Sequence, residues 1–208
     1  MKILLVGFGK VNRLIYELYE DLVVGIYDLN TKFINDNPDV IIDFSHPDFL
    51  NQSIELINKY KCPIVIGTTN YNDEKMAQIK EISNNYPVLI SNNFSLGIYL
   101  LERMLSGNMK LLEMYQREII ETHHNNKISS PSGTSLHLSK LLNTANITSI
   151  RIGDVVGTHE IILERANEVL SINHIINDRR VYAEGAIASA CWLLDKKPGL
   201  YSYGDIYE

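Results

Sequence analysis

The stretch Ile3-Leu4-Leu5-Val6-Gly7-Phe8-Gly9-Lys10-Val11-Asn12 decides the fold of the N-terminal half. Its apolar start predicts a short buried strand, and apolar residues then recur at helical spacing over 11–22. A glycine-rich turn between a strand and a helix is the context in which a G-x-G-x-x-G pattern predicts a dinucleotide site. The third glycine position holds Asn12, so we expect the helix to shift without loss of phosphate binding.

Working outward, short apolar strands alternate with helices throughout residues 1–90. We expect strands at 3–6, 23–27, 40–43, 63–66 and 88–90, and helices at 11–22, 48–60 and 73–83. Such alternation predicts a doubly wound parallel sheet that helices cover on both faces. The first domain is therefore expected to be a Rossmann-like dinucleotide-binding domain of the α/β class.

The second half of the chain has a different pattern. Helices are expected at 96–105, 136–142 and 179–194, and strands at 118–122, 149–152, 160–163 and 169–176. Consecutive strands with short turns predict a mixed sheet in a smaller α+β domain. We place the first domain at 1–92, joined by the C-terminal segment 183–208, and the second at 93–182.

Composition narrows the class of partner. The chain has 208 residues and a net charge of −6, which argues against a nucleic-acid partner. No stretch is long and apolar enough for a membrane span. The two cysteines, Cys62 and Cys191, lie far apart in no C-x-x-C pattern, which favours a reducing cytoplasm over a disulfide framework.

Asp28 ends the second expected strand, about twenty residues past the glycine turn, where an acidic side chain accepts hydrogen bonds from a ribose 2′-hydroxyl. The same carboxylate repels a 2′-phosphate, so we expect NADH to be preferred and NADPH to remain possible. Lys32 complicates this preference, although Asn30 and Thr31 suggest a flexible loop. The alternative interpretation is an ordinary turn with a surface aspartate.

The segment Glu121-Thr122-His123-His124-Asn125-Asn126-Lys127, followed by Ser130-Pro131-Ser132-Gly133-Thr134, carries the chemistry. A histidine titrates near neutral pH and a lysine can supply a proton or hold developing charge. Neighbours on an extended chain point to opposite sides, so the two histidines are expected to do different jobs. Gly133 and Thr134 begin a helix whose free N–H groups form an anion site.

Simpler interpretations of this segment remain open. Adjacent histidines at a strand end are often only solvated polar residues, and Ser132 or Thr134 can serve merely as a helix cap. A zinc site is the least favoured hypothesis, because the sequence suggests no third ligand in a suitable place. We therefore expect no metal.

This segment resembles the signature E-x-H-H-x-x-K-x-D-x-P-S-G-T of 4-hydroxy-tetrahydrodipicolinate reductases. Ser129 stands where that family has aspartate, and Asn70 replaces the glycine usual after Thr68 and Thr69. The resemblance spans nearly the whole chain through further landmarks. They are Asp43-Phe44-Ser45, Gly67-Thr68-Thr69, Asn93-Phe94-Ser95, Arg151-x-Gly153, Gly157-x-His159 and the run from Arg179 to Gly185.

The resemblance implies hydride transfer from NAD(P)H to the dihydrodipicolinate ring, in the diaminopimelate and lysine pathway. His123 would be the acid/base residue, Lys127 the proton donor, and His124, Gly133 and Thr134 the contacts to a small cyclic dicarboxylate. It also implies a homotetramer built through the second domain's sheet. The implied cofactor residues are Gly7, Phe8, Gly9, Lys10, Val11, Asn12, Asp28, Gly67, Thr68, Thr69, Ser91, Asn93 and Phe94.

Two other functions compete with this one. The first is a related NAD-dependent dehydrogenase of aspartate or a diamino acid, which would share the glycine turn but lack the paired H-H-x-x-K and P-S-G-T segments. The second is a non-catalytic nicotinamide-binding sensor, which the loss of His123 or Lys127 would have favoured; both residues are present.

Overall fold

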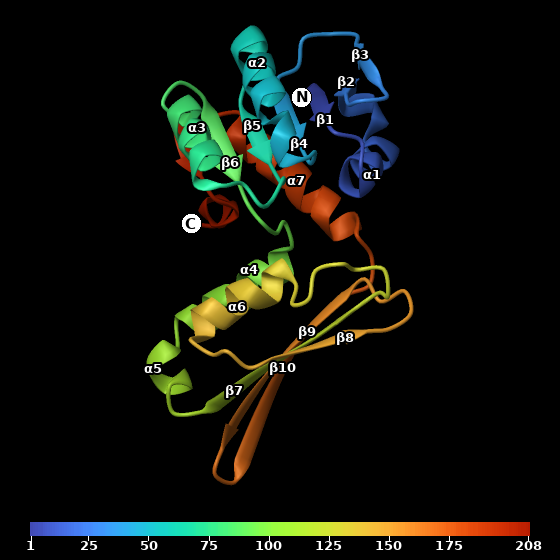
Figure 1. The fold of residues 1–208 in the computed structure, drawn as a ribbon. Helices are drawn as coiled ribbons and strands as arrows, with labels where there is room; N and C mark the ends of the chain where they lie inside the picture. The colour runs from blue at the N-terminus through green and yellow to red at the C-terminus, as the bar shows by residue number, and fades with distance from the viewer. The chain divides into compact units, whose positions relative to one another are not determined.

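The computed structural model describes residues 1–208, which fold as two compact units (Figure 1). Unit 1 comprises Met1–Phe94 together with Arg180–Glu208, and unit 2 comprises Ser95–Arg179. Unit 1 is thus built from two separate stretches of chain, which appear in Figure 1 as the blue-to-green and the red parts of the ribbon. No helix is long and apolar enough to cross a membrane.

Unit 1 contains a seven-stranded sheet in the order β11-β6-β5-β4-β1-β2-β3. All neighbouring strands are parallel except the antiparallel pair β2–β3, so the predicted parallel α/β sheet is confirmed. The strands β1 and β4 are buried along their whole lengths, as expected for a sheet covered on both faces. The strand bounds are β1 Ile3–Val6, β2 Val23–Tyr27, β3 Lys32–Ile34, β4 Val40–Asp43, β5 Ile64–Ile66, β6 Pro87–Ile90 and β11 Gly199–Tyr201.

Two layers of helices cover this sheet. Helices α2 (Leu50–Tyr60) and α3 (Asp73–Ser83) pack their apolar residues onto one face, where Leu4, Ile41 and Ile64 lie. Strand residues that alternate with these point to the other face, along which α7 (Arg180–Leu193) runs beside α1 (Lys10–Leu18). The helix expected over 11–22 ends at Leu18, and a separate 3₁₀ turn follows it. The helix expected over 48–60 begins as an α-helix only at Leu50, because a 3₁₀ turn precedes it. The 3₁₀ turns are Glu20–Leu22, Pro47–Phe49 and Tyr203–Ile206.

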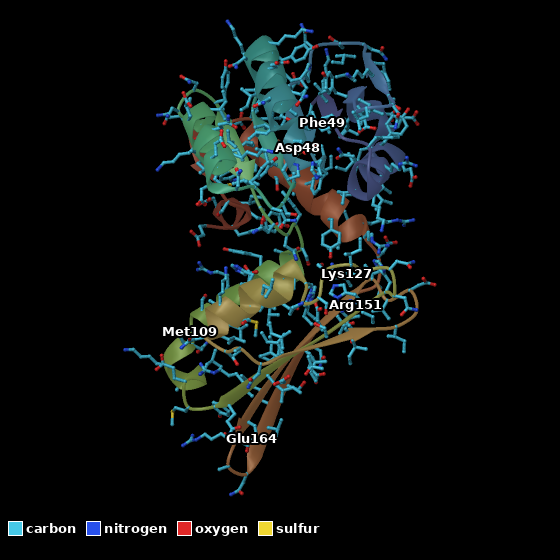
Figure 2. All side chains as sticks on the ribbon, in the orientation of Figure 1. Asp48, Phe49, Met109, Lys127, Arg151 and Glu164 are labelled. Atoms are coloured by element: carbon cyan, nitrogen blue, oxygen red, sulfur yellow. The ribbon has the colours of Figure 1, made fainter.

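Unit 2 contains a four-stranded mixed sheet in the order β10-β9-β7-β8, of which only β7 and β8 are parallel. Helices α4 and α6 cover one face, and their core includes Leu101, Leu138 and Ile161. Figure 2 labels Lys127 and Arg151 near one end of this sheet and Glu164 near the other. The bounds are α4 Leu96–Ser106, α5 Met109–Leu112, β7 Gln116–His123, α6 Gly133–Leu142, β8 Ile147–Arg151, β9 Gly157–Arg165 and β10 Glu168–Ile176.

Candidate active site

The glycine turn of unit 1 requires its glycines. Gly7 has a φ of +77°, and a Cβ at this residue would lie 2.7 Å from the Cα of Ser45. Gly9 is the N-cap of α1 and provides no side-chain hydrogen bond to the helix. The first N–H groups of α1 therefore have no side-chain cap, which is the arrangement that suits a phosphate group.

Asn12 occupies the third position of the fingerprint and is fully buried. Its Nδ2 donates hydrogen bonds of 2.8 Å to the backbone oxygens of Val6 and Gly7. The amide therefore ties the first turn of α1 to the end of β1, where a glycine would only allow close packing. The departure from the glycine pattern is thus an additional anchor for the turn.

The segment after β2 is a short turn that leads directly into β3, whereas its flexibility stays a prediction. The N–H of Asp28 donates to the oxygen of Thr31 at 2.8 Å, and Lys32 already begins β3. The Lys32 Nζ lies 4.6 Å from the centre of the Tyr27 ring, an attractive position for a cation. Leu29, beside Asp28, is 77% exposed.

A buried carboxylate, Asp43, organises the ends of β4 and β5. Its oxygens accept hydrogen bonds from the N–H and Oγ of Ser45, from Thr68 Oγ1 and from Ser53 Oγ, all within 2.9 Å. Burial nevertheless raises the pKa of Asp43, because these hydrogen bonds offset only part of the loss of water. The loops after both strands are thereby fixed to one point.

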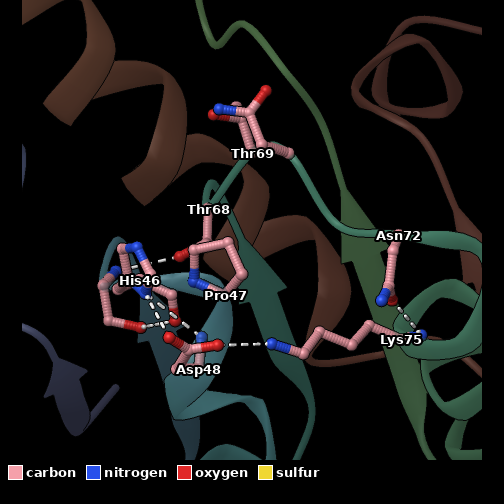
Figure 3. Close-up of a pocket in the computed structure, with 9 residues that line it drawn as sticks. His46, Pro47, Asp48, Thr68, Thr69, Asn72 and Lys75 are labelled. Atoms are coloured by element: carbon pink, nitrogen blue, oxygen red, sulfur yellow. Dashed lines mark hydrogen bonds and ion pairs between the residues drawn. The ribbon is translucent and has the colours of Figure 1, made fainter.

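These loops line an open pocket of about 430 Å³ (Figure 3). Asp48 lies on its wall and pairs with Lys75 at 2.7 Å and with His46 at 3.3 Å. Asn70 has a φ of +66°, which explains why glycine or asparagine suits this position. The residues that line the pocket are Ser45, His46, Pro47, Asp48, Thr68, Thr69, Asn70, Asn72 and Lys75.

Of the other residues expected at the cofactor, Lys10 is exposed and Phe8 and Val11 are half-buried, whereas Phe94 lies in the core of unit 1. A Cβ at Gly67 would overlap the Phe44 ring, at 2.1 Å from its nearest atom. Phe94 is 2% exposed and packs against the rings of Phe44 and Tyr203. Ser91 Oγ donates to the oxygen of Asn93 at 2.6 Å, which fixes the segment that follows β6.

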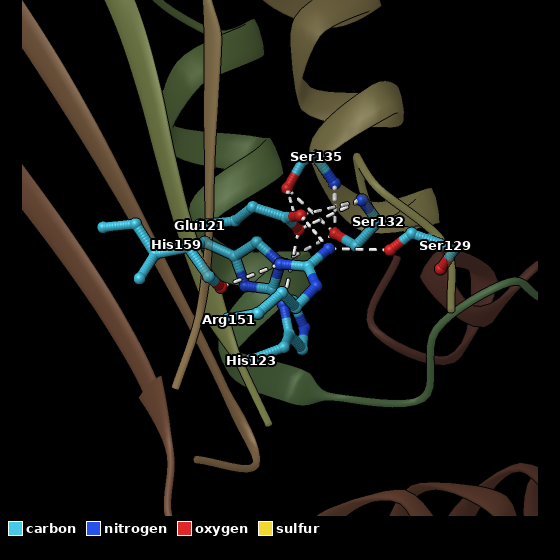
Figure 4. Close-up of polar contacts among 8 residues, drawn as sticks. Glu121, His123, Ser129, Ser132, Ser135, Arg151 and His159 are labelled. Atoms are coloured by element: carbon cyan, nitrogen blue, oxygen red, sulfur yellow. Dashed lines mark hydrogen bonds and ion pairs between the residues drawn. The ribbon is translucent and has the colours of Figure 1, made fainter. Parts of the chain in front are cut away.

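In unit 2 the fully buried Glu121 of β7 is the centre of a polar cluster (Figure 4). Oε1 accepts from Arg151 at 2.7 Å, Oε2 accepts from Ser135 Oγ at 2.9 Å, and both oxygens accept from the Ser132 N–H at 3.1 Å. Burial raises the pKa of this carboxyl, but the hydrogen bonds from Ser132, Arg151 and Ser135 outweigh it and the pKa is about 2. Glu121 is therefore ionised at neutral pH.

Three histidines lie side by side on the same face of this sheet. His123 of β7 and His159 of β9 have ring centres 5.4 Å apart, and His174 of β10 follows at 6.3 Å. Burial and, to a lesser extent, the charge of Lys127 lower the pKa of His123 to about 4, against the opposite effect of Glu121. Burial likewise lowers the pKa of His159 to about 4. Both rings are neutral at pH 7 in the free protein.

Helix α6 begins at Gly133, beside this cluster. Ser132 is its N-cap, and Ser132 Oγ accepts from the Ser135 N–H at 3.2 Å, so the capping role considered for Ser132 is confirmed. Apart from its chain neighbours and the backbone of α6, no atom lies within 4 Å of the position of a Cβ on Gly133, so there is open space at the helix start. The loop before it turns at His124, whose oxygen accepts from the Lys127 N–H.

The expectation that a third metal ligand is missing is wrong on geometry. Ligand atoms of Glu121, His123 and His159 all lie within 4.8 Å of one another. Arg151 and the two serines already occupy the carboxylate oxygens, however, and Arg151 adds a positive charge that opposes a cation. That the protein works without a metal stays a prediction.

The sequence interpretation gave no role to four members of the cluster: Glu121, Ser135, Arg151 and His159. One signal was available for Glu121, because it stands two residues before His123 and so faces the same side of β7. Arg151 and His159 stand in two of the family landmarks, but no local signal indicates that they join this cluster, and none marks Ser135. In the sheet, Arg151 of β8 lies opposite His123, and His159 of β9 lies opposite Glu121. Both positions follow from the register of strands that are distant in the sequence.

Unit 1 has a Rossmann-type sheet with an uncapped glycine turn, and unit 2 has a histidine–carboxylate cluster next to a helix start. Fold and cluster together define the chain as a two-domain oxidoreductase of the nucleotide-binding type. Two family profiles match it: "Dihydrodipicolinate reductase, N-terminus" over residues 19–94 and "Dihydrodipicolinate reductase, C-terminus" over residues 97–207. The chain belongs to the dihydrodipicolinate reductase family, whose members are enzymes of lysine and diaminopimelate biosynthesis.

Individual proteins similar in sequence to this chain carry the name of the same enzyme. The chain is 35% identical to 4-hydroxy-tetrahydrodipicolinate reductase of Brachyspira hyodysenteriae, over 99% of both chains. It is 34% identical to the protein of the same name from Thermosipho africanus, over 99% of this chain and 97% of the relative. The fold is shared with a dipicolinate-bound dihydrodipicolinate reductase from Paenisporosarcina sp. TG-14, with a TM-score of 0.78 at 18% identity over the full length of both chains. Membership of this family does not favour the amino-acid dehydrogenase and sensor hypotheses.

Proposed function

We propose that this enzyme reduces the dihydrodipicolinate ring formed from 4-hydroxy-tetrahydrodipicolinate and gives tetrahydrodipicolinate. Unit 1 is proposed to bind the nicotinamide cofactor, which supplies the hydride when bound. Unit 2 is proposed to bind the small cyclic dicarboxylate. The observation that carries the proposal is the buried cluster around His123, next to the open helix start at Gly133.

The helix start gives unit 2 a means of holding a carboxylate. The positive end of the α6 dipole and the backbone N–H groups of Gly133 and Thr134 attract an anion. The Glu121 carboxylate already accepts from the Ser132 N–H, and Ser132 Oγ accepts from Ser135, so those two donors serve the protein itself. Gly133 and Thr134, the first two residues of α6, are the proposed carboxylate contacts, with His124 as a further contact.

Hydride addition to a conjugated imine leaves electron density that a proton must quench, and His123 and Lys127 are the proposed sources. The pKa of His123 lies near 4 partly because Lys127 is positive. A bound dianion neutralises that charge and favours the protonated imidazole. Substrate binding would thus raise the pKa of His123 and let it act as an acid. Lys127 would hold the substrate's charge or deliver the proton.

For the cofactor we propose NADH as the preferred donor, by about tenfold over NADPH, or ~1.4 kcal/mol. Asp28 suits a ribose 2′-hydroxyl and disfavours a 2′-phosphate. Lys32, the cation that would favour the phosphate, begins β3 and lies over the Tyr27 ring. The other proposed cofactor contacts are Gly7, Phe8, Gly9, Lys10, Val11, Asn12, Gly67, Thr68, Thr69, Ser91, Asn93 and Phe94.

We further propose a homotetramer in the cytoplasm that assembles through the sheet of unit 2. The sheet face opposite α4 and α6 carries apolar side chains, among which Ile150, Val169 and Ile175 are 42%, 65% and 60% exposed. A second copy of the same face would bury them. Light scattering on the purified protein tests this; a monomer at micromolar concentration would contradict it.

The decisive test of activity is a steady-state assay with purified protein, NADH and enzymatically generated substrate. We expect cofactor oxidation that depends on the substrate. Parallel assays with aspartate or meso-diaminopimelate and the oxidised cofactor should show no turnover. Turnover of those amino acids, with none of the cyclic dicarboxylate, would refute the proposed function.

A further inference from the structure

The contact between Glu121 and His123 places a buried carboxylate beside one particular nitrogen of the His123 ring. Both side chains project from the same face of β7, and Oε2 of Glu121 lies 3.3 Å from Nδ1 of His123. Arg151 of β8 and Ser135 of α6 hold the two carboxylate oxygens from other directions. The carboxylate can therefore neither turn away from the ring nor reach water.

This contact distinguishes the two ring nitrogens of His123. Nδ1 makes no hydrogen bond in this structure, so the preference comes from charge. The negative carboxylate 3.3 Å away favours the neutral form of the ring that carries its hydrogen on Nδ1. The other nitrogen, Nε2, lies toward Gly157, where an added Cβ would come within 3.2 Å of it. The glycine leaves space beside Nε2 that a larger residue would reduce.

We propose that Glu121 is a positioning residue that acts through His123: it holds the ring as the Nδ1–H tautomer and leaves Nε2 to exchange a proton with the substrate. The inference rests on the proposed function and assigns the reacting atom within it. The imidazolium that forms when Nε2 takes up a proton lies against a negative charge. When Nε2 gives that proton to the substrate, the ring returns to the neutral Nδ1–H form. Neither Glu121 nor Arg151 changes its protonation in this cycle.

The test combines an isosteric variant with a direct reading of the tautomer. Glu121→Gln keeps the volume but removes the charge, and its amide can donate to Nδ1, which favours the opposite tautomer. We expect turnover to fall at least tenfold, which is part of the roughly hundredfold or more that a general acid–base group contributes. Nitrogen-15 NMR of labelled protein should show hydrogen on Nδ1 of His123 in the wild type and on Nε2 in the variant. The pKa of His123 should fall in the variant, because the Glu121 charge raises it.

Glu102→Gln is the matched control. Glu102 lies 3.4 Å from Nε2 of His137 on α6, so the variant removes another contact to the same helix without touching His123. Its turnover and the His123 tautomer should be unchanged. Hydrogen on Nε2 of His123 in the wild-type protein would overturn the inference even if Glu121→Gln does not fold. Absence of reductase activity in the wild type would instead refute the proposed function, while the NMR measurement still decides the tautomer.

Discussion

His159 lies directly opposite Glu121 in the antiparallel register of β9 and β7. The imidazole is 2% exposed, and Ser132 Oγ lies 3.4 Å from its Nε2. A buried ring with so little water around it resists protonation, whereas the same ring in the unfolded chain titrates near its ordinary value. The folded protein therefore carries a built-in sensitivity to acid.

The first prediction concerns stability between neutral and acidic pH. The pKa of His159 is about 4 in the folded state against 6.5 ordinarily, so the unfolded state binds more protons between these values. The free energy of unfolding should fall as pH drops from 6.5 to 4. In His159→Gln, the loss between pH 7 and pH 4.5, measured by urea unfolding, should be smaller by ~2 kcal/mol.

His137→Gln is the contrasting variant for this measurement. The hydrogen bond to Glu102 raises the pKa of His137, so its contribution is present at low pH and is lost as pH rises. Its removal should make the acid loss larger, not smaller. An identical pH dependence in wild type and His159→Gln would show that His159 is not the buried titrating group.

The second prediction concerns the proton donors. His123→Ala and Lys127→Ala should each reduce turnover by roughly a hundredfold or more, the usual scale for general acid–base groups. NADH binding, measured by calorimetry, should be nearly unchanged, because both residues belong to unit 2. Near-wild-type turnover in both variants would refute the assignment.

The third prediction separates carboxylate binding from helix capping. Thr134→Val should raise the Michaelis constant more than it lowers turnover, since binding made equally in ground and transition states appears in that constant. Ser132→Ala removes the observed cap and should lower the free energy of unfolding by ~1 kcal/mol or more. If Thr134→Val changed only the melting temperature, Thr134 would be a structural residue.

The fourth prediction concerns cofactor choice. Titration calorimetry should give a dissociation constant for NADH roughly tenfold below that for NADPH. Leu29→Arg should reduce or reverse this difference, because an exposed arginine beside Asp28 can pair with a 2′-phosphate bidentately. Tighter NADPH binding by the wild type, weakening steeply with salt, would show that Lys32 dominates and that Asp28 does not set the preference.

Strong local patterns made most of the fold predictable. The β4 run from Val40 to Asp43 is buried throughout, and helix α3 has the predicted bounds. Strands β3 and β11 escaped prediction because each has three residues, partly exposed, and exists only through its pairing with β2 or β6. The site likewise has a part that local sequence predicts and a part that depends on folding. A local motif marks His123, whereas the Arg151 contact to Glu121 depends on strands brought together by folding.

The division of unit 1 into two stretches has a consequence for the order in which the protein forms during synthesis. A ribosome delivers every residue of unit 2 before it delivers α7 and β11, which complete unit 1. The face of the sheet that α7 covers stays open until Arg180–Leu193 has emerged, and the edge of β6 lacks its partner until Gly199–Tyr201 follows. At about 5–20 residues per second, a nascent chain spends seconds in this state. Unit 2 can thus be native while unit 1, whose two stretches flank it in the sequence, is still incomplete.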